Sequence, residues 1–141
     1  HVAQGKAVWA ECGGMMLLFD ELVDKAGATH AMWGLLPGRV VMQKRLAALG
    51  PQQLDVSTES GGSLGTLRGH TFHWSLTDTP LVPIARTQRP GMAAQPVASG
   101  AEGEALYAHG PVRASYFHAW FPSAPAAVAA LLSPQPLMER T

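Results

Sequence analysis

The sequence predicts an α/β fold, and three observations support this class. An apolar stretch at residues 7–10 leads through Cys12 into a segment whose apolar residues recur at spacings of three and four, which is typical of a strand followed by a helix. The middle of the chain holds several short extended segments separated by glycines, and a segment beginning at Pro125 is typical of a closing helix. The predicted order is one strand–helix unit, several consecutive strands and a final helix.

The first strand is expected at residues 7–10, because this stretch, Ala-Val-Trp-Ala, is short and apolar throughout. The helix after it would carry one apolar face, formed by Met15, Leu18, Phe19 and Leu22. The acidic residues and the lysine between positions 20 and 25 would take the other face, with Gly27 as a suitable stop.

Five further strands are expected before the closing helix, at residues 40–42, 54–57, 64–75, 105–108 and 114–117. Glycine-rich punctuation at residues 61–63 predicts a hairpin there, and Gly110-Pro111 predicts a turn between the last two strands. Residues 80–103 show little periodicity and are predicted to form a long loop. The closing helix would use Ser123 as its N-cap, Pro125 in its first turn, and cover residues 126–132.

Composition excludes several classes of protein. The chain has 141 residues with ten acidic and ten basic side chains, so it lacks the basic excess of a nucleic-acid-binding surface. No apolar run approaches the ~20 residues that span a bilayer, so no membrane partner is expected. The single cysteine excludes an internal disulfide, and we expect a cytoplasmic protein. The chain does not begin with Met and leads directly into a core strand, so we expect a fragment of a longer domain.

Cys12 occupies the position of a nucleophile elbow, between a strand and a helix and directly before Gly13 and Gly14. A thiolate nucleophile needs a lowered pKa, a base within reach and donors for an oxyanion. We expect the helix N-terminus to favour the thiolate, and the backbone N–H of Gly13 to face the oxyanion. Taken alone, a cysteine followed by two glycines is more often a small buried residue than a nucleophile.

His118 is the best candidate for the base among six histidines. It ends an apolar predicted strand, and sites in open α/β sheets gather at the carboxyl ends of strands. A histidine in an apolar stretch is also commonly a hydrogen-bonded core residue, and that alternative stays open. His70 and His73 would face opposite sides of one strand and make a poor metal pair. No metal-ligand spacing and no phosphate-binding loop occurs, so neither a metal nor ATP is expected in this chain.

Four motifs in one order carry a family resemblance. They are Ala-Glu-Cys-Gly-Gly-Met-Met at 10–16, Gly-Leu-Leu-Pro-Gly at 34–38, Arg-Gly-His-x-Phe-His-x-Ser at 68–75, and Ala-Ser-Tyr-Phe-His at 114–118. Together they resemble the C-terminal glutamine amidotransferase domain of cobyrinic acid a,c-diamide synthases, from Gly5 to about Leu132. The third motif favours these enzymes over the related cobyric acid synthases.

The resemblance implies a flavodoxin-like, class I-type glutamine amidotransferase domain, with residues 1–141 as its C-terminal part and its first strands lacking. It implies that glutamine is hydrolysed to glutamate and ammonia, with Cys12 forming the glutamyl thioester and His118 as base. Gly13 and Gly14 would bind the oxyanion or substrate. Ammonia would pass to an upstream domain that amidates corrin carboxylates with ATP and magnesium. Whether the corrin carries cobalt, and whether the protein is a homodimer, stays open.

Three places depart from the family pattern, and one of them is Gly50-Pro51, where the family has Gly-Tyr after the Arg-Leu segment. Related amidotransferases usually have a glutamate two residues after the histidine, where it orients the imidazole. The corrin-amidating family often has a histidine there, and this chain has Trp120. The central motif usually has a glutamate where this chain has Thr71. The last two departures motivate an alternative, a non-catalytic domain kept as a docking or regulatory surface. A third hypothesis is an amidotransferase with another acceptor, such as cobyric acid or a cell-wall precursor.

Overall fold

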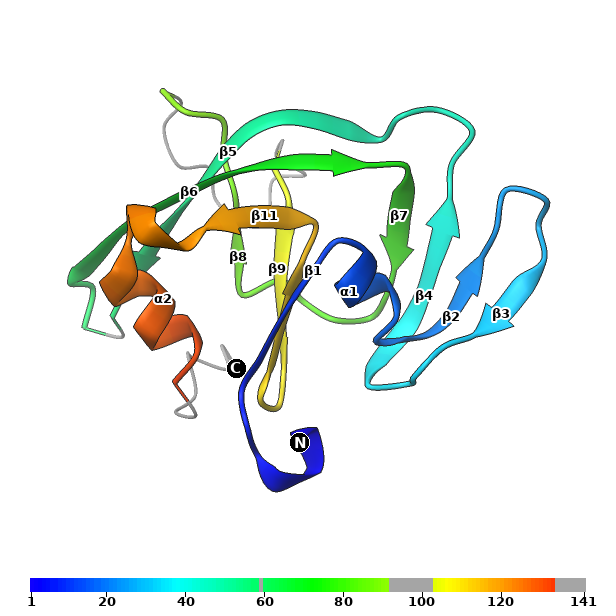
Figure 1. Ribbon diagram of the computed structural model, residues 1–141, viewed down its shortest axis with the longest axis horizontal. Coiled ribbons are helices and arrows are strands. Elements are labelled where there is room, and N and C mark those ends of the chain that lie inside the picture. Colours follow the sequence, from blue (N-terminus) through cyan, green and yellow to red (C-terminus); the bar gives the residue numbers. More distant parts are fainter. Residues whose placement is uncertain (59, 92–102, 134–141) are drawn as a thin grey trace.

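The computed structural model describes residues 1–58, 60–91 and 103–133, arranged as three small sheets with short helices at their edges (Figure 1). The first sheet has the order β1 (Val8–Glu11), β10 (Val112–Ser115), β9 (Ala105–His109), β8 (Ala85–Arg86). The second has the order β11 (Phe117–Trp120), β6 (Ser63–His73), β5 (Ala48–Ser57). The third has the order β3 (Thr29–Ala31), β2 (Phe19–Val23), β4 (Leu36–Met42), β7 (Ser75–Asp78). The helical elements are η1 (Val2–Gln4), α1 (Gly13–Met16), η2 (Phe121–Ser123) and α2 (Pro125–Leu131).

The strand before Cys12 pairs in parallel with the strand before His118. In the register of this pair, Val8 faces Val112 and Glu11 faces Ser115, so β1 and β10 end at the same edge of the sheet. The second partner of β10 is β9, across the turn predicted at Gly110, whose φ is 53°. The predicted hairpin between β5 and β6 is also present as an antiparallel pair.

The helix predicted from Met15 to Leu22 is wrong beyond its first turn. Helix α1 ends at Met16, and residues Phe19–Val23 form strand β2. Both neighbours of β2 supply backbone hydrogen bonds, β3 antiparallel and β4 parallel, so the sheet replaces the bonds that a longer helix would make. Three of the four apolar positions are core positions, since Met15, Leu18 and Phe19 are buried, whereas Leu22 is only partly buried.

Four other predicted elements need correction. The predicted strand at 114–117 is divided at Tyr116, because β10 ends at Ser115 and β11 begins at Phe117, so His118 lies within β11 instead of following a strand. Ser123 ends η2 and is not the N-cap of α2, whose N-cap is Ala124. The Ser123 hydroxyl instead donates to the Trp120 carbonyl at 2.7 Å and accepts from the Arg68 backbone N–H at 2.9 Å, which ties this turn to β6. The predicted loop at 80–103 contains the short strand β8, and its residues 92–102 lie outside the described part of the chain. The predicted strand at 64–75 is two strands of different sheets, β6 and β7, which meet at Trp74.

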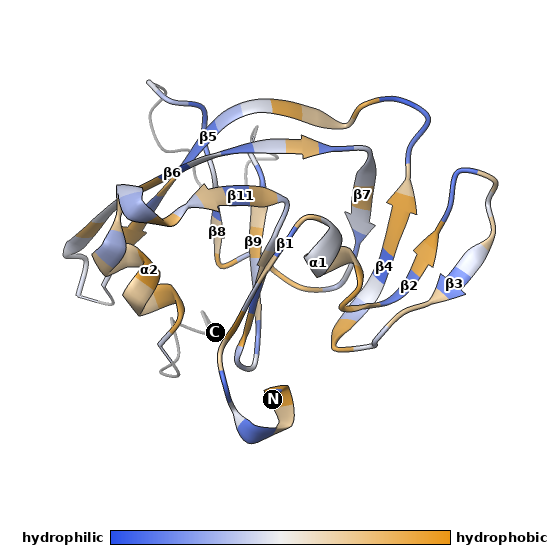
Figure 2. Ribbon diagram, viewed as in Figure 1, coloured by the Kyte–Doolittle hydropathy of each residue, from blue (hydrophilic) through white to orange (hydrophobic). Residues whose placement is uncertain are grey.

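The core consists of two clusters that meet just before His118. The first gathers residues of β1, α1, β2, β4 and β10, among them Phe19, Val40 and Tyr116. The second lies between β5, β6 and α2 and includes Phe117. Figure 2 shows hydrophobic residues concentrated along β2 and β4, in agreement with the first cluster. Since Tyr116 and Phe117 are consecutive, the chain is anchored in both clusters directly before His118. In the described residues, no helix has the length and apolar character needed to span a membrane.

Candidate active site

Cys12 lies in a strained turn between β1 and α1. Its φ and ψ are 46° and −112°, and it is the one non-glycine residue with positive φ within the described ranges. The backbone N–H of Cys12 donates to the Ser115 carbonyl at 2.9 Å, and its carbonyl accepts from the Met16 N–H at 2.9 Å. A strained nucleophile between a strand and a helix is the geometry of a nucleophile elbow.

The surroundings of the thiol raise its pKa. Burial is the largest cause, the charges of Glu104 and Glu11 act in the same direction, and a hydrogen bond from the Gly13 backbone opposes them. The net direction is opposite to the lowered pKa expected from the sequence, because α1 is a single turn and burial outweighs its dipole. The thiol sulfur also lies 3.7 Å from the Phe72 carbonyl oxygen, its acceptor on β6. These surroundings thus favour the neutral thiol over the thiolate.

Gly13 and Gly14 are exposed and border open space. A Cβ added at either position would meet no other atom within 4 Å. Neither glycine has a positive φ, so their conformation does not require glycine. Side chains here would project into open space near Cys12.

His118 lies at the edge of the sheets where the elbow also opens. Cys12 directly follows β1, and His118 follows the end of β10, the parallel neighbour of β1. The imidazole Nδ1 of His118 lies 4.0 Å from a carboxylate oxygen of Glu11, the residue before Cys12. The structure therefore brings both predicted residues to one edge, with Glu11 beside them.

His70 and His73 occupy opposite faces of β6, as predicted. His70 is exposed and stacks on His118, with ring centroids 4.8 Å apart and an interplanar angle of 8°. His73 is buried and stacks on Tyr116, with centroids 3.7 Å apart. The central motif thus contacts the His118 segment from both faces of the strand. Within residues 1–58, 60–91 and 103–133, no three metal-ligating side chains gather closely enough to hold a metal ion.

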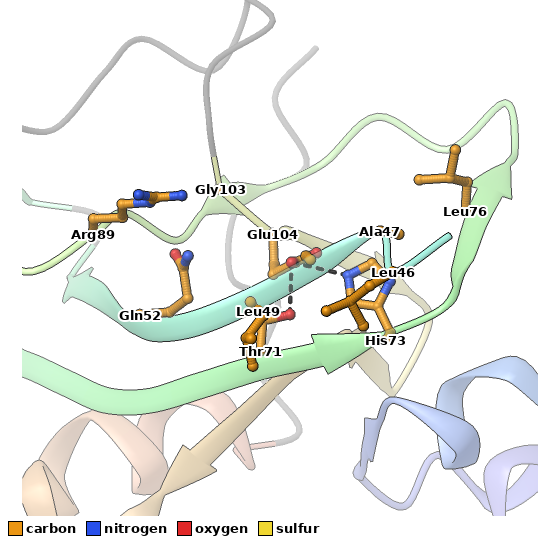
Figure 3. A pocket seen from close by; sticks show the side chains of 11 residues that line it. Leu46, Ala47, Leu49, Gln52, Thr71, His73, Leu76, Arg89, Gly103 and Glu104 are labelled. Carbon is orange, nitrogen blue, oxygen red and sulfur yellow. Dashed lines mark hydrogen bonds and ion pairs between the residues drawn. The ribbon is translucent and has the colours of Figure 1, made fainter. Parts of the chain in front are cut away.

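Thr71 and His73 share a carboxylate that comes from a distant part of the chain. The hydroxyl of Thr71 donates to Glu104 Oε1 at 2.7 Å, and His73 Nε2 lies 3.0 Å from the same oxygen (Figure 3). Burial acts to raise the pKa of Glu104, but the contacts of His73 and Thr71 and the charge of Arg86 together lower it. Glu104 therefore supplies a carboxylate beside Thr71 and His73.

A groove of about 430 Å³ lies beside this carboxylate. Figure 3 shows the Thr71–His73–Glu104 group at its floor, with Gln52, Arg89 and several leucines around it. Thr71 and His73 lie on the face of β6 opposite to His70.

Sequence reasoning missed three residues of this region, namely Glu11, Gly69 and Glu104. Glu11 and Gly69 were visible as members of the quoted motifs, beside Cys12 and His70. A Cβ on Gly69 would overlap the His118 carbonyl oxygen and lie 2.6 Å from the Phe117 ring, so only glycine lets β11 approach β6 this closely. Glu104 carried no signal, since it lies at the end of a segment with no periodicity.

Comparison with known proteins defines the class. Residues 1–126 match the family of CobB/CobQ-like glutamine amidotransferase domains, and the chain belongs to this family. The resemblance found in the sequence is confirmed, and with it the α/β, flavodoxin-like amidotransferase class.

Several curated relatives are similar over most of this chain. The cobyrinate a,c-diamide synthase of Herminiimonas arsenicoxydans is 47% identical over 128 residues, which are 91% of this chain and 26% of that protein. The hydrogenobyrinate a,c-diamide synthase of Stutzerimonas stutzeri is 44% identical over 134 residues, 95% of this chain and 28% of that protein. The cobyrinate a,c-diamide synthase of Salmonella typhimurium is 35% identical over 126 residues, 86% of this chain and 26% of that protein. The chain thus spans about a quarter of the length of these relatives.

Proposed function

We propose that this chain is the glutaminase part of a cobyrinate or hydrogenobyrinate a,c-diamide synthase, with Cys12 as nucleophile and His118 as general base. The strained conformation of Cys12 is the observation that carries the proposal, because an L-residue with φ of 46° persists only where the surrounding structure holds it. The location of His118 at the same strand edge supports it. The names of the relatives favour a diamide synthase over another acceptor.

The first half of the reaction transfers the glutamyl group to Cys12. His118 accepts the thiol proton, and Sγ attacks the side-chain carboxamide carbon of glutamine. The backbone N–H of Gly13 donates to the oxyanion of the tetrahedral intermediate, with Gly14 leaving room for substrate. The C–N bond then breaks, His118 returns its proton to the leaving nitrogen, and ammonia departs from a glutamyl thioester.

The second half releases glutamate. His118 removes a proton from a water molecule, whose oxygen attacks the thioester carbon. The C–S bond breaks, the thiolate takes back the proton from His118, and glutamate leaves. The raised pKa of Cys12 makes the base necessary in the first step and makes reprotonation of the sulfur favourable in the last.

The ammonia would serve an amidation outside this chain. We assign no metal or cofactor to residues 1–141, which we regard as the C-terminal part of one amidotransferase domain acting in the cytoplasm. ATP and magnesium would activate corrin carboxylates in a preceding domain, and the ammonia formed at Cys12 would attack the activated carboxyl carbon.

A glutamine-mimicking diazo-ketone tests the nucleophile directly. The protein is produced as encoded in its gene, incubated with the reagent and digested for mass spectrometry. We expect one adduct on Cys12, blocked by excess glutamine and absent in Cys12→Ala. If the reagent reacts fully with the wild-type protein, in which His118 is present, but forms no adduct on Cys12, the assignment is overturned. Corrin amidation from glutamine that survives in Cys12→Ser would favour the non-catalytic alternative.

A further inference from the structure

The carboxylate of Glu11 is held in one orientation by two hydrogen bonds. Its Oε1 accepts from the indole Nε1 of Trp9 at 2.7 Å and from the backbone N–H of Ala119 at 2.9 Å. Both donors use the same oxygen, and the other oxygen, Oε2, lies 4.0 Å from Nδ1 of His118. The free oxygen of an anchored carboxylate therefore lies beside the imidazole.

The anchors of Glu11 are themselves fixed. Trp9 lies two residues before Glu11 on β1, so both side chains are on one face of the strand. The Trp9 ring packs edge-on against Phe121 with centroids 6.3 Å apart, and it contacts the second core cluster. Ala119 directly follows His118 on β11. Glu11 thus connects the strand that carries the nucleophile with the strand that carries the imidazole.

A carboxylate at Nδ1 has a defined chemical effect. A neutral histidine that takes a proton at Nε2 must carry its own proton at Nδ1, and a carboxylate acceptor there selects that tautomer. It also stabilises the imidazolium once the proton has been taken. A separation of 4.0 Å exceeds a hydrogen bond, but such contacts are often long before substrate binds and shorten in the reacting complex.

We propose that Glu11 is the positioning residue of His118, and that it orients the imidazole from the position directly before the nucleophile. This rests on the proposed function of His118 as base. Two residues after His118 the chain has Trp120, whose side chain is 59% exposed and has no carboxylate to offer. Glu11 supplies a carboxylate at Nδ1 of His118 instead, and its hydrogen bond with the Ala119 N–H links β1 to β11.

The first test compares glutamine hydrolysis by the wild-type protein, produced as its gene encodes it, with hydrolysis by Glu11→Gln. Glutamine keeps the acceptor oxygen for Trp9 and Ala119 but loses the charge that faces His118. We expect kcat to fall at least about tenfold with KM changed less than about threefold and the melting temperature unchanged. Glu21→Gln on β2, a carboxylate in a different sheet, is the matched control and should keep the wild-type kcat. A kcat within twofold of wild type in Glu11→Gln would overturn the proposal.

A second measurement needs no activity and so separates this proposal from the function it rests on. Nitrogen NMR of protein with labelled histidine rings reports the tautomer of His118, assigned by its loss in His118→Gln. We expect the Nδ1–H form in the wild type and a mixture in Glu11→Gln. An Nε2–H form in the wild type would exclude the proposed role of Glu11. If the tautomer is as expected but Cys12→Ala still hydrolyses glutamine, the proposed nucleophile is wrong and the positioning role stands.

Discussion

The imidazole rings of His70 and His118 lie face to face across the β6–β11 pair, 4.8 Å apart and within 8° of parallel. The two residues are direct partners in the antiparallel register, so the stack follows from the strand pairing itself. It limits rotation of the His118 ring on one face, while Glu11 lies at its Nδ1 edge. The ring that we propose as base is thus restricted from two directions.

Removal of this stack should slow glutamine hydrolysis. We expect His70→Ala to lower kcat by roughly threefold to tenfold, since a stacked ring pair contributes about 0.5–1.5 kcal/mol. His70→Phe keeps a flat ring at the same place and should retain most of the activity. Steady-state kinetics of both variants test the idea, and equal losses in Phe and Ala would contradict it.

A side chain at Gly69 should separate β6 from β11. A methyl group there would overlap the carbonyl of His118 and press on the Phe117 ring. We expect Gly69→Ala to lower the free energy of unfolding by about 1–3 kcal/mol, the usual cost of overpacking. Denaturant unfolding measures the change. Gly14→Ala is the stability control, because its methyl group meets open space. If Gly14→Ala loses as much free energy of unfolding as Gly69→Ala, the steric explanation is excluded.

The raised pKa of Cys12 predicts a specific pH dependence of alkylation. Burial favours the neutral thiol, so the thiolate forms only at a higher pH than in an unfolded chain. We expect the iodoacetamide rate of the folded protein to rise with a midpoint above that of the same protein in denaturant. Glu11→Gln removes one nearby negative charge, so its midpoint should move down even as its kcat falls. A midpoint below the unfolded value in the wild type would contradict the environment described for Cys12.

Glu104 should stabilise the fold most at neutral pH. Its pKa is lowered in the folded state, so its contribution is present above the unfolded pKa and is lost as the pH falls through the folded pKa. We expect Glu104→Gln to cost about 1–3 kcal/mol at pH 7, since Thr71 and His73 lose a charged acceptor. The same variant should show a weaker fall in stability between about pH 5 and about pH 3. Urea unfolding at several pH values measures the loss at pH 7 and the pH dependence. If Glu104→Gln and the wild type lose stability equally as the pH falls, Glu104 does not contribute to the pH dependence.

Elements defined by local signals were predictable from the sequence. The hairpin of β9 and β10 follows from two apolar runs and the turn at Gly110, and β1 follows from its short apolar stretch. The segment after Met16 was not predictable, because the spacing of Leu18 and Phe19 suits both a helix face and a turn followed by a buried strand. The choice depends on β3 and β4, whose hydrogen bonds no local pattern reveals.

The same limit applies to the candidate site. Cys12 could be named because it follows β1, which local sequence reveals. His118 was named as the end of a strand at 114–117, but the structure divides that segment between β10 and β11 and places His118 on β11. The contact between Glu11 and the N–H of Ala119 joins residues 108 positions apart, and Glu104 reaches Thr71 across 33 positions. Both contacts depend on how the sheets meet, so their partners appear only in three dimensions.

Tyr116 and Phe117 connect the two core clusters through the backbone. The side chain of Tyr116 is buried in the first cluster, and that of Phe117 is buried in the second. His118 is the next residue, whereas Cys12 packs against the first cluster only. The distance between the proposed nucleophile and the proposed base therefore depends on how the two core clusters pack against each other. Leu131 is buried in the second cluster and lies on α2, which carries none of the proposed catalytic residues. Looser packing around Leu131 should nevertheless lower the turnover of glutamine, because it changes how the two clusters pack together.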